Sequence, residues 1–158
     1  MKTLFFTLLF LSMTAKATDF QNVKQLALKN GLKPSNRVIK AVVTAARWYQ
    51  LNPLELAAIG IIETGLGKYN VDVINKNGTV DTGLFQINTI NTSKCPEFNL
   101  NTPEGSSMCA ARLLQRIRRQ YQNVDESWPA IYHSKTKKHK EQYFQKLSKV
   151  LAKIEATK

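Results

Sequence analysis

The carboxyl group of Glu63 lies in an apolar stretch of the sequence, where an acidic side chain is unusual. Leu56 and Ile59 precede it by seven and four positions, so the three side chains share one face if this segment is helical. Loss of hydration there raises the pKa of a carboxyl group, which then keeps a proton near neutral pH and can donate it. Glu63 is therefore a candidate catalytic acid. The alternative, a helix-end glutamate that reaches solvent or pairs with a lysine, fits this spacing as well.

Three short motifs add to this pattern. They are Glu63-Thr64-Gly65, Gly83-Leu84-Phe85-Gln86-Ile87-Asn88 and Ile131-Tyr132-His133-Ser134. In order and spacing they resemble the Glu-Ser-Gly, Gly-Leu-x-Gln-Ile and Ala-Tyr-Asn elements of the soluble lytic transglycosylases and goose-type lysozymes. The Tyr-His-Ser form of the third motif resembles the small transglycosylases that accompany type III and type IV secretion, type IV pili and conjugation systems. The sequence departs from the family pattern at Thr64, Ile131 and His133, where serine, alanine and asparagine are usual.

The resemblance implies cleavage of the β-1,4 bond between N-acetylmuramic acid and N-acetylglucosamine in peptidoglycan. Glu63 would protonate the glycosidic oxygen and then accept a proton from the muramyl 6-hydroxyl, which closes a 1,6-anhydro ring. Tyr132 would hydrogen-bond Glu63 and hold it in place. Gly83 would let the backbone approach the sugar closely, and the Gln86 amide would bind an N-acetyl or hydroxyl group. The other substrate-binding residues implied by these motifs are Thr64, Leu84, Asn88 and His133.

Asp81 is a candidate second catalytic carboxylate. The segment 75–88 also resembles the β-hairpin of animal-type lysozymes, where an aspartate at this position takes part in hydrolysis. If Asp81 faces Glu63 across a cleft, a hydrolytic lysozyme is the alternative to a transglycosylase, whereas a turn aspartate could simply bond the backbone. We favour the lytic transglycosylase. A third hypothesis is a non-enzymatic basic protein that binds cell wall or an assembly partner.

The elements that must position these residues are predicted to be mostly helical. Ser35 and Asn52 are suitable helix caps, and Pro53 suits the first turn of the apolar helix that ends near Glu63. Asn77-Gly78 favours a hairpin turn. The predicted helices cover Phe20–Asn30, Ser35–Tyr49, Asn52–Gly65, Thr102–Gln122, Ser127–Tyr132 and Lys138–Glu155. We therefore expect a mainly α, lysozyme-like α+β fold, with one helical domain and a small β-hairpin beside the cleft. Phe85 and Ile87 are expected mainly in the core.

The N-terminal segment has the pattern of a secretory signal peptide. Lys2 is followed by the apolar run Thr3–Met13, and Ala15 and Ala17 supply the small residues before a cleavage site. We predict removal of residues 1–17, which leaves residues 18–158 as the catalytic domain in the periplasm or outside the cell. The apolar run is shorter than the roughly 20 residues that span a bilayer, so no stable membrane anchor is expected.

Cysteine content and charge agree with export to the cell wall. Cys95 and Cys109 are the two cysteines of the chain and are expected to form a disulfide. The formal net charge of +12 favours an acidic partner such as peptidoglycan, and export argues against nucleic acid. His133 and His139 have no further ligand-type residues nearby, so neither a metal nor another cofactor is implied. We expect a monomer.

Overall fold

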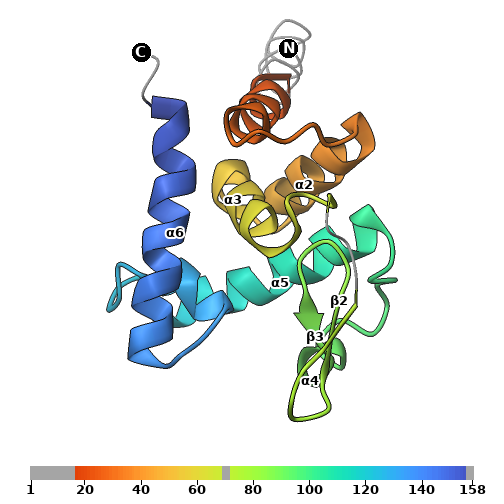
Figure 1. The fold of residues 1–158 in the computed structure, drawn as a ribbon, viewed down its shortest axis with the longest axis vertical. Helices are drawn as coiled ribbons and strands as arrows, with labels where there is room; N and C mark the ends of the chain where they lie inside the picture. The colour runs from red at the N-terminus through yellow and green to blue at the C-terminus, as the bar shows by residue number, and fades with distance from the viewer. Residues whose placement is uncertain (1–16, 69–71, 156–158) are drawn as a thin grey trace, which may run out of the picture.

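The computed structural model describes residues 17–68 and 72–155. Residues 1–16 of the predicted signal peptide lie outside the described residues, so the cleavage site stays a prediction. The described chain is mainly helical and carries a small three-stranded antiparallel sheet, which confirms the expected fold class (Figure 1). Across the ranges described, no helix combines the length and apolar character needed to cross a membrane.

The N-terminal half consists of a helix over residues 17–29, α2 (Asn36–Trp48) and α3 (Pro53–Thr64). The predicted caps are confirmed: the Ser35 hydroxyl accepts the backbone N–H of Val38 at 3.3 Å, and Asn52 Oδ1 accepts that of Leu54 at 2.9 Å. These bonds satisfy backbone donors that have no partner within the helix. Gly65, in the left-handed conformation, ends α3 two positions after Glu63.

The sheet places Asp81 in its middle strand. β1 (Val73–Ile74), β2 (Val80–Thr82) and β3 (Ile87–Asn88) pair in that order, with Asp81 opposite Val73 on one side and Asn88 on the other. The predicted hairpin around Asn77-Gly78 is confirmed. The third strand and the short helix α4 (Thr89–Thr92) were not expected, because two and four residues are too few to show a periodic pattern.

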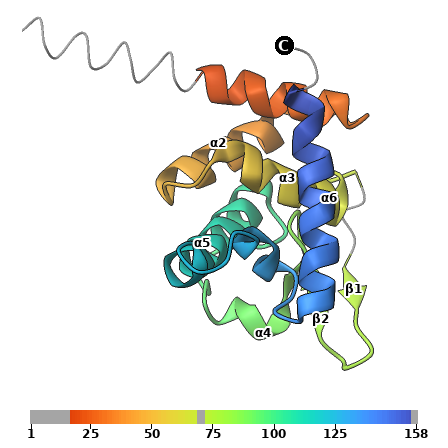
Figure 2. The same cartoon turned by 90° about the vertical axis from the view of Figure 1, so that its left-hand side faces the viewer.

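The C-terminal half contains α5 (Pro103–Tyr121), the 3₁₀ helix η1 (Trp128–Tyr132) and α6 (Lys137–Glu155). All three were predicted within one residue or two. Helix α5 packs on α2, while α6 packs on α3 and on η1 (Figures 1 and 2). In Figure 1 α6 stands on the left and the sheet lies at the lower right, with α5 running between them across the molecule. The largest fully buried side chains come from the first helix, α2, α3, β3 with the turn before it, and α5, and include Phe85, Leu26, Ile39, Leu56, Ile59, Ile87 and Leu114.

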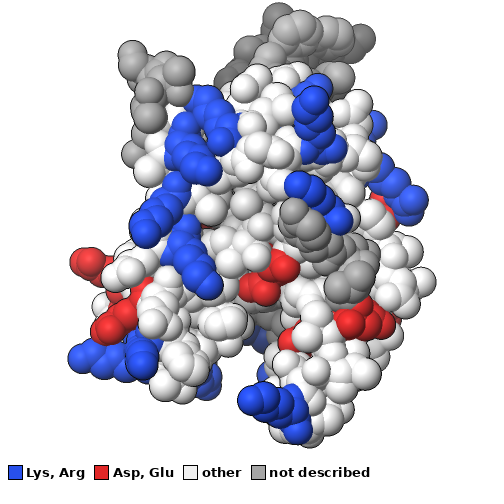
Figure 3. All heavy atoms as spheres, viewed as in Figure 1, with Lys and Arg blue, Asp and Glu red and all other residues white. Residues whose placement is uncertain are grey.

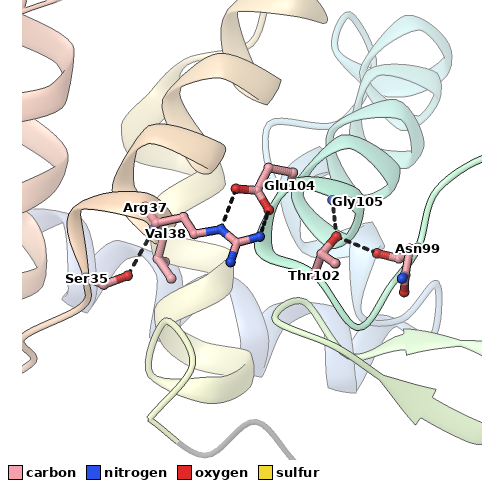
Figure 4. A network of polar contacts seen from close by, with 7 residues as sticks. All are labelled: Ser35, Arg37, Val38, Asn99, Thr102, Glu104 and Gly105. Carbon is pink, nitrogen blue, oxygen red and sulfur yellow. Dashed lines mark hydrogen bonds and ion pairs between the residues drawn. The ribbon is translucent and has the colours of Figure 1, made fainter.

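Two contacts tie the start of α5 to other segments. The predicted disulfide Cys95–Cys109 is present, with its Cα atoms 5.6 Å apart. Closing a loop of this length stabilises the folded state by about 3 kcal/mol, because it restricts the unfolded chain. In Figure 4 the guanidinium of Arg37 on α2 makes two hydrogen bonds to the carboxylate of Glu104 on α5, at 2.8 and 3.0 Å. This pair is exposed and stabilises by at most about 1 kcal/mol. The disulfide is the stronger constraint, and it fits an oxidising compartment.

Candidate active site

Glu63 projects from the last turn of α3 into a pocket of about 1090 Å³. Burial raises the pKa of its carboxyl to about 7, which confirms the direction expected from its apolar surroundings. A hydrogen bond from Tyr143 and the charge of Lys146 act in the opposite direction, while the nearby charge of Asp81 raises this pKa further. A large share of Glu63 is therefore protonated at neutral pH, as a general acid requires.

Tyr143 on α6, and not Tyr132, is the tyrosine that holds Glu63. The Tyr143 hydroxyl donates to Glu63 Oε1 at 2.5 Å. The Tyr132 hydroxyl instead donates to the backbone carbonyl of Phe85 at 3.0 Å, so the predicted bond from Tyr132 to Glu63 is wrong. Tyr132 is still close, because the charge of Glu63 contributes, after burial, to the raised pKa of its phenol. Tyr132 therefore holds the second motif in place beside the acid.

The sequence could indicate that Tyr143 would be buried, but it could not indicate that Glu63 would be its hydrogen-bond partner. Tyr143 and Leu147 are four positions apart in the predicted last helix, so they share one face of it, and both are buried. A buried tyrosine usually directs its hydroxyl to a hydrogen-bond partner. The partner is 80 positions away in the chain, and only the packing of α6 on α3 brings the two together.

His133 stacks on the ring of Tyr143 at the edge of the pocket. The ring centroids are 4.7 Å apart and the planes differ by 8°. Burial is the main cause that lowers the pKa of His133, with contributions from Lys146 and His139, whereas Asp81 raises it. The imidazole is thus mainly neutral at neutral pH. It lines the pocket, as the motif implied, and packs on the side chain that orients Glu63.

Asp81 lines the same pocket as Glu63, so the structure brings the two candidate carboxylates together. Each of its oxygens accepts an amide hydrogen bond: Oδ2 from Asn75 at 2.9 Å and Oδ1 from Asn88 at 2.7 Å. Asn88 also caps α4, because its own Oδ1 accepts the N–H of Ile90 at 3.1 Å. Asn88 therefore fixes the aspartate. Asn75, which lies in the hairpin segment 75–88 but was not predicted as a site residue, has the same function.

Thr64 and Leu84 do not face the pocket. Both are buried, and the Thr64 hydroxyl donates to the Leu84 carbonyl at 2.7 Å and accepts the N–H of Gly67 at 3.1 Å. These bonds join the end of α3 to the second motif. The expected substrate contacts of the two side chains are therefore corrected to a structural role, because neither has a surface that a sugar could reach.

Gly83 also has a different function from the expected one. Its φ is +77°, and a Cβ atom built there would lie 2.2 Å from the backbone oxygen of Leu100. The close approach that requires glycine is thus to the protein's own backbone before α5, and not to a sugar. Glycine at this position lets the second motif pack against residues that precede α5.

Gln86 lies in the pocket, as predicted, in an unusual backbone conformation. Its φ of +47° is uncommon for a residue other than glycine, and such strain often occurs at functional sites. The turn is held because both its backbone N–H and its side-chain Nε2 lie 3.1 Å from the Gly83 carbonyl. The second motif is therefore a constrained turn that directs Gln86 toward the pocket.

The other walls of the pocket come from α4 and the residue Lys94 after it, from α5, and from the segment that follows η1. Helix α5 contributes residues three or four positions apart, which form one face of a helix. This face consists of Leu113, Arg116, Ile117, Gln120 and Tyr121. Figure 3 shows the surface hollowed between the sheet and the lower end of α6. Within residues 17–68 and 72–155, no group of three His, Cys, Asp or Glu side chains could hold a metal ion.

Replacing Tyr143 with phenylalanine is expected to move the alkaline limb of the pH–activity profile upward. In the wild type the hydrogen bond from Tyr143 favours the charged form of Glu63. Without this bond the pKa of Glu63 rises above about 7. A hydrogen bond to a charged group contributes about 1.5–3 kcal/mol, which corresponds to roughly one to two pH units. The measurement is kcat/KM against pH for release of soluble fragments from purified sacculi.

Tyr132→Phe is the matched control, because its hydroxyl donates to a backbone carbonyl. It should leave the alkaline limb near that of the wild type, even if the rate falls. Equal shifts in both variants would contradict the assignment of Tyr143 as the positioning residue for Glu63.

Comparison of the chain with protein-family models, with curated proteins and with solved structures gives no match in any of the three. The chemistry open to this site therefore follows from its own geometry. That geometry combines one buried acid with a pKa near neutrality, a tyrosine that orients it, and a second carboxylate held by two amides.

Proposed function

We propose that this protein is a peptidoglycan lytic transglycosylase that cleaves the β-1,4 bond after N-acetylmuramic acid. The observation that carries the proposal is Glu63, whose pKa of about 7 and whose bond from Tyr143 suit a positioned proton donor in a large pocket. The pocket volume of about 1090 Å³ lies above the range of roughly 300–1,000 Å³ typical of small-ligand sites. There is thus room for more than one sugar unit.

In the first step Glu63 transfers its proton to the glycosidic oxygen, and the bond between that oxygen and C1 of the muramyl unit breaks. The positive charge that develops at C1 is stabilised by a nearby carboxylate. Asp81 can supply this charge, since Asn75 and Asn88 hold both of its oxygens in the same pocket.

In the second step the ionised Glu63 accepts the proton of the muramyl 6-hydroxyl. The freed oxygen bonds to C1, which closes the 1,6-anhydro ring and returns Glu63 to its protonated form. No water is consumed, and one carboxyl group serves both steps. A pKa near neutrality suits this double use, because the group must donate and accept a proton at the same pH.

Hydrolysis is the second candidate, and the position of Asp81 is the observation that favours it. In glycosidases two carboxylates flank the scissile bond, one as acid and one as nucleophile or base. Asp81 and Glu63 line one pocket, and the charge of Asp81 acts on the pKa of Glu63. A lysozyme that uses this pair would leave a reducing muramic acid end.

Mass spectrometry of the fragments released from purified sacculi separates these two reactions. The transglycosylase predicts 1,6-anhydro-muramyl ends, which are lighter than reducing ends by one water. Predominantly reducing ends would contradict the transglycosylase and show that the protein is a hydrolase. Sacculi that release no fragments, when treated with folded and disulfide-bonded protein, would contradict both.

The proposed location is the periplasm or the cell exterior, where the enzyme would open the wall locally for a secretion, pilus or conjugation apparatus. Support comes from the predicted signal peptide, from the disulfide and from the motif that resembles the secretion-associated enzymes. Separation of the mature protein from spheroplasts by osmotic release would test the location.

A further inference from the structure

Four cationic side chains surround the pocket that contains Glu63. Lys76 comes from the turn between β1 and β2, Lys94 follows α4, Arg116 is on α5, and Lys135 lies between η1 and α6. All four are exposed. They come from four separate segments, whereas the solvated face of one helix would place its charges on a single element. The fold thus gathers positive charge around one cavity.

These cations have no acidic partner in the described part of the chain. The ion pairs Arg37–Glu104, Arg47–Asp19, Arg112–Glu97 and Lys140–Asp125 involve none of the four. Of the four pocket cations, Lys94 donates to the neutral Asn91 side chain at 2.5 Å, and Lys135 lies 5.9 Å from the centre of the Tyr121 ring. None of the four pocket cations is therefore held in one of these ion pairs.

The two carboxylates of the pocket offset this charge only in part. Glu63 has a pKa of about 7, so about half of it carries a charge at neutral pH, and Asp81 directs both oxygens to asparagine amides rather than to a cation. Positive side chains therefore outnumber negative ones in the lining of the pocket.

The surroundings of Arg116 suit a sugar chain that carries such anionic groups. Its neighbours on the same face of α5 are two aliphatic side chains, an amide and an aromatic ring, those of Leu113, Ile117, Gln120 and Tyr121. Aliphatic and aromatic side chains can pack on the apolar face of a sugar ring, and an amide can bond its hydroxyl or acetamido groups. A cation within this face can reach a charged substituent of the ring.

We infer that Lys76, Lys94, Arg116 and Lys135 bind carboxylate groups carried by the glycan strand, so that the protein selects carboxylated muramyl glycans over neutral glycans of equal length. The inference rests on the proposed function and specifies its substrate. Two sources of carboxylate occur in peptidoglycan. One is the lactyl group of a muramyl unit without a peptide, and the other is the peptide stem.

Binding experiments with the Glu63→Gln variant, which does not consume its ligand, separate these cases. Titrations at low ionic strength compare three saccharides of equal length. They are neutral N-acetylglucosamine oligomers, peptide-free alternating glycans with free lactyl carboxylates, and the same glycans with their peptide stems. Three proteins are compared, and all of them carry Glu63→Gln. The first has no other change, the second also carries Lys94→Gln and Arg116→Gln, and the third also carries Arg119→Gln. Arg119 is a matched control because it is exposed on α5, three positions from Arg116, and does not line the pocket.

The carboxylated glycans are expected to bind about tenfold more tightly than the neutral oligomers, and the Lys94/Arg116 double variant should lose most of this difference. The Arg119 variant should retain it, and added salt should weaken only the carboxylated ligands. Tighter binding of the peptide-free glycan identifies the lactyl group as the source, and tighter binding of the stem-bearing glycan identifies the peptide.

Equal affinity for neutral and carboxylated glycans would overturn this inference and leave the proposed function intact. So would an equal loss in the Arg119 control, because the effect would then be one of overall charge. Failure to bind any of the three saccharides would count against the proposed function itself.

Discussion

Replacing Glu63 with glutamine is expected to lower the rate of glycan cleavage at least about 10³-fold, which is within the range of general acid–base contributions. Glutamine keeps the size of the side chain and an oxygen that can accept from Tyr143, but it has no proton of suitable acidity. Both steps of the proposed reaction use this carboxyl group, so neither should proceed. The measurement is initial release of soluble fragments from purified sacculi near neutral pH.

Glu126→Gln is the control for this substitution, since Glu126 is exposed and does not line the pocket. It should retain the wild-type rate. Substantial activity of the Glu63 variant on sacculi would overturn the assignment of Glu63 as the acid.

The same Glu63 variant should be more stable than the wild type above neutral pH. Because the pKa of Glu63 is raised from 4.5 to about 7 on folding, the native state holds a proton that the unfolded state has lost between these values. Stability therefore falls as pH rises through this window. The cost of ionising the buried group reaches up to about 3 kcal/mol above pH 7. Denaturant unfolding at pH 5 and pH 8 should show a gain for Glu63→Gln at pH 8 alone.

Replacing Gly83 with alanine is expected to destabilise the protein by at least about 3 kcal/mol. An alanine at a φ of +77° is strained by about 1–3 kcal/mol, and its Cβ would lie 2.2 Å from the Leu100 oxygen, so the backbone must also move. For a chain of this size the melting temperature should fall by roughly 6–12 °C. Thermal unfolding followed by circular dichroism gives this value.

Gly78→Ala separates strain from steric overlap. Gly78 has nearly the same φ, +78°, but a Cβ atom added there would have no neighbour within 4 Å. This variant should therefore lose only the cost of the strained backbone, about 1–3 kcal/mol. If Gly83→Ala were as stable as Gly78→Ala but lost activity, the contact of Gly83 with the Leu100 backbone would not explain the glycine. The close contact with the sugar that the motif implies would then be correct.

Local features of the fold could be predicted because their physical causes lie within a few residues. The predicted caps Ser35 and Asn52 bond backbone donors only two or three positions away. The hairpin at Asn77-Gly78 follows from its turn residues in the same way. The two elements that escaped prediction, β3 and α4, are too short to have a periodic signal, and tertiary pairing determines them.

Within the candidate site, the sequence by itself determined that the carboxyl of Glu63 would lose hydration and be the candidate acid, because the apolar face of α3 is encoded locally around Glu63. It also determined the disulfide, since Cys95 and Cys109 are the only pair available.

Only the tertiary structure decided the partners of the site. Tyr143 replaced Tyr132 beside Glu63, and Gly83 met the Leu100 backbone. Four cations from separate segments gathered around one pocket. These contacts join residues far apart in the chain, so they depend on how the helices pack.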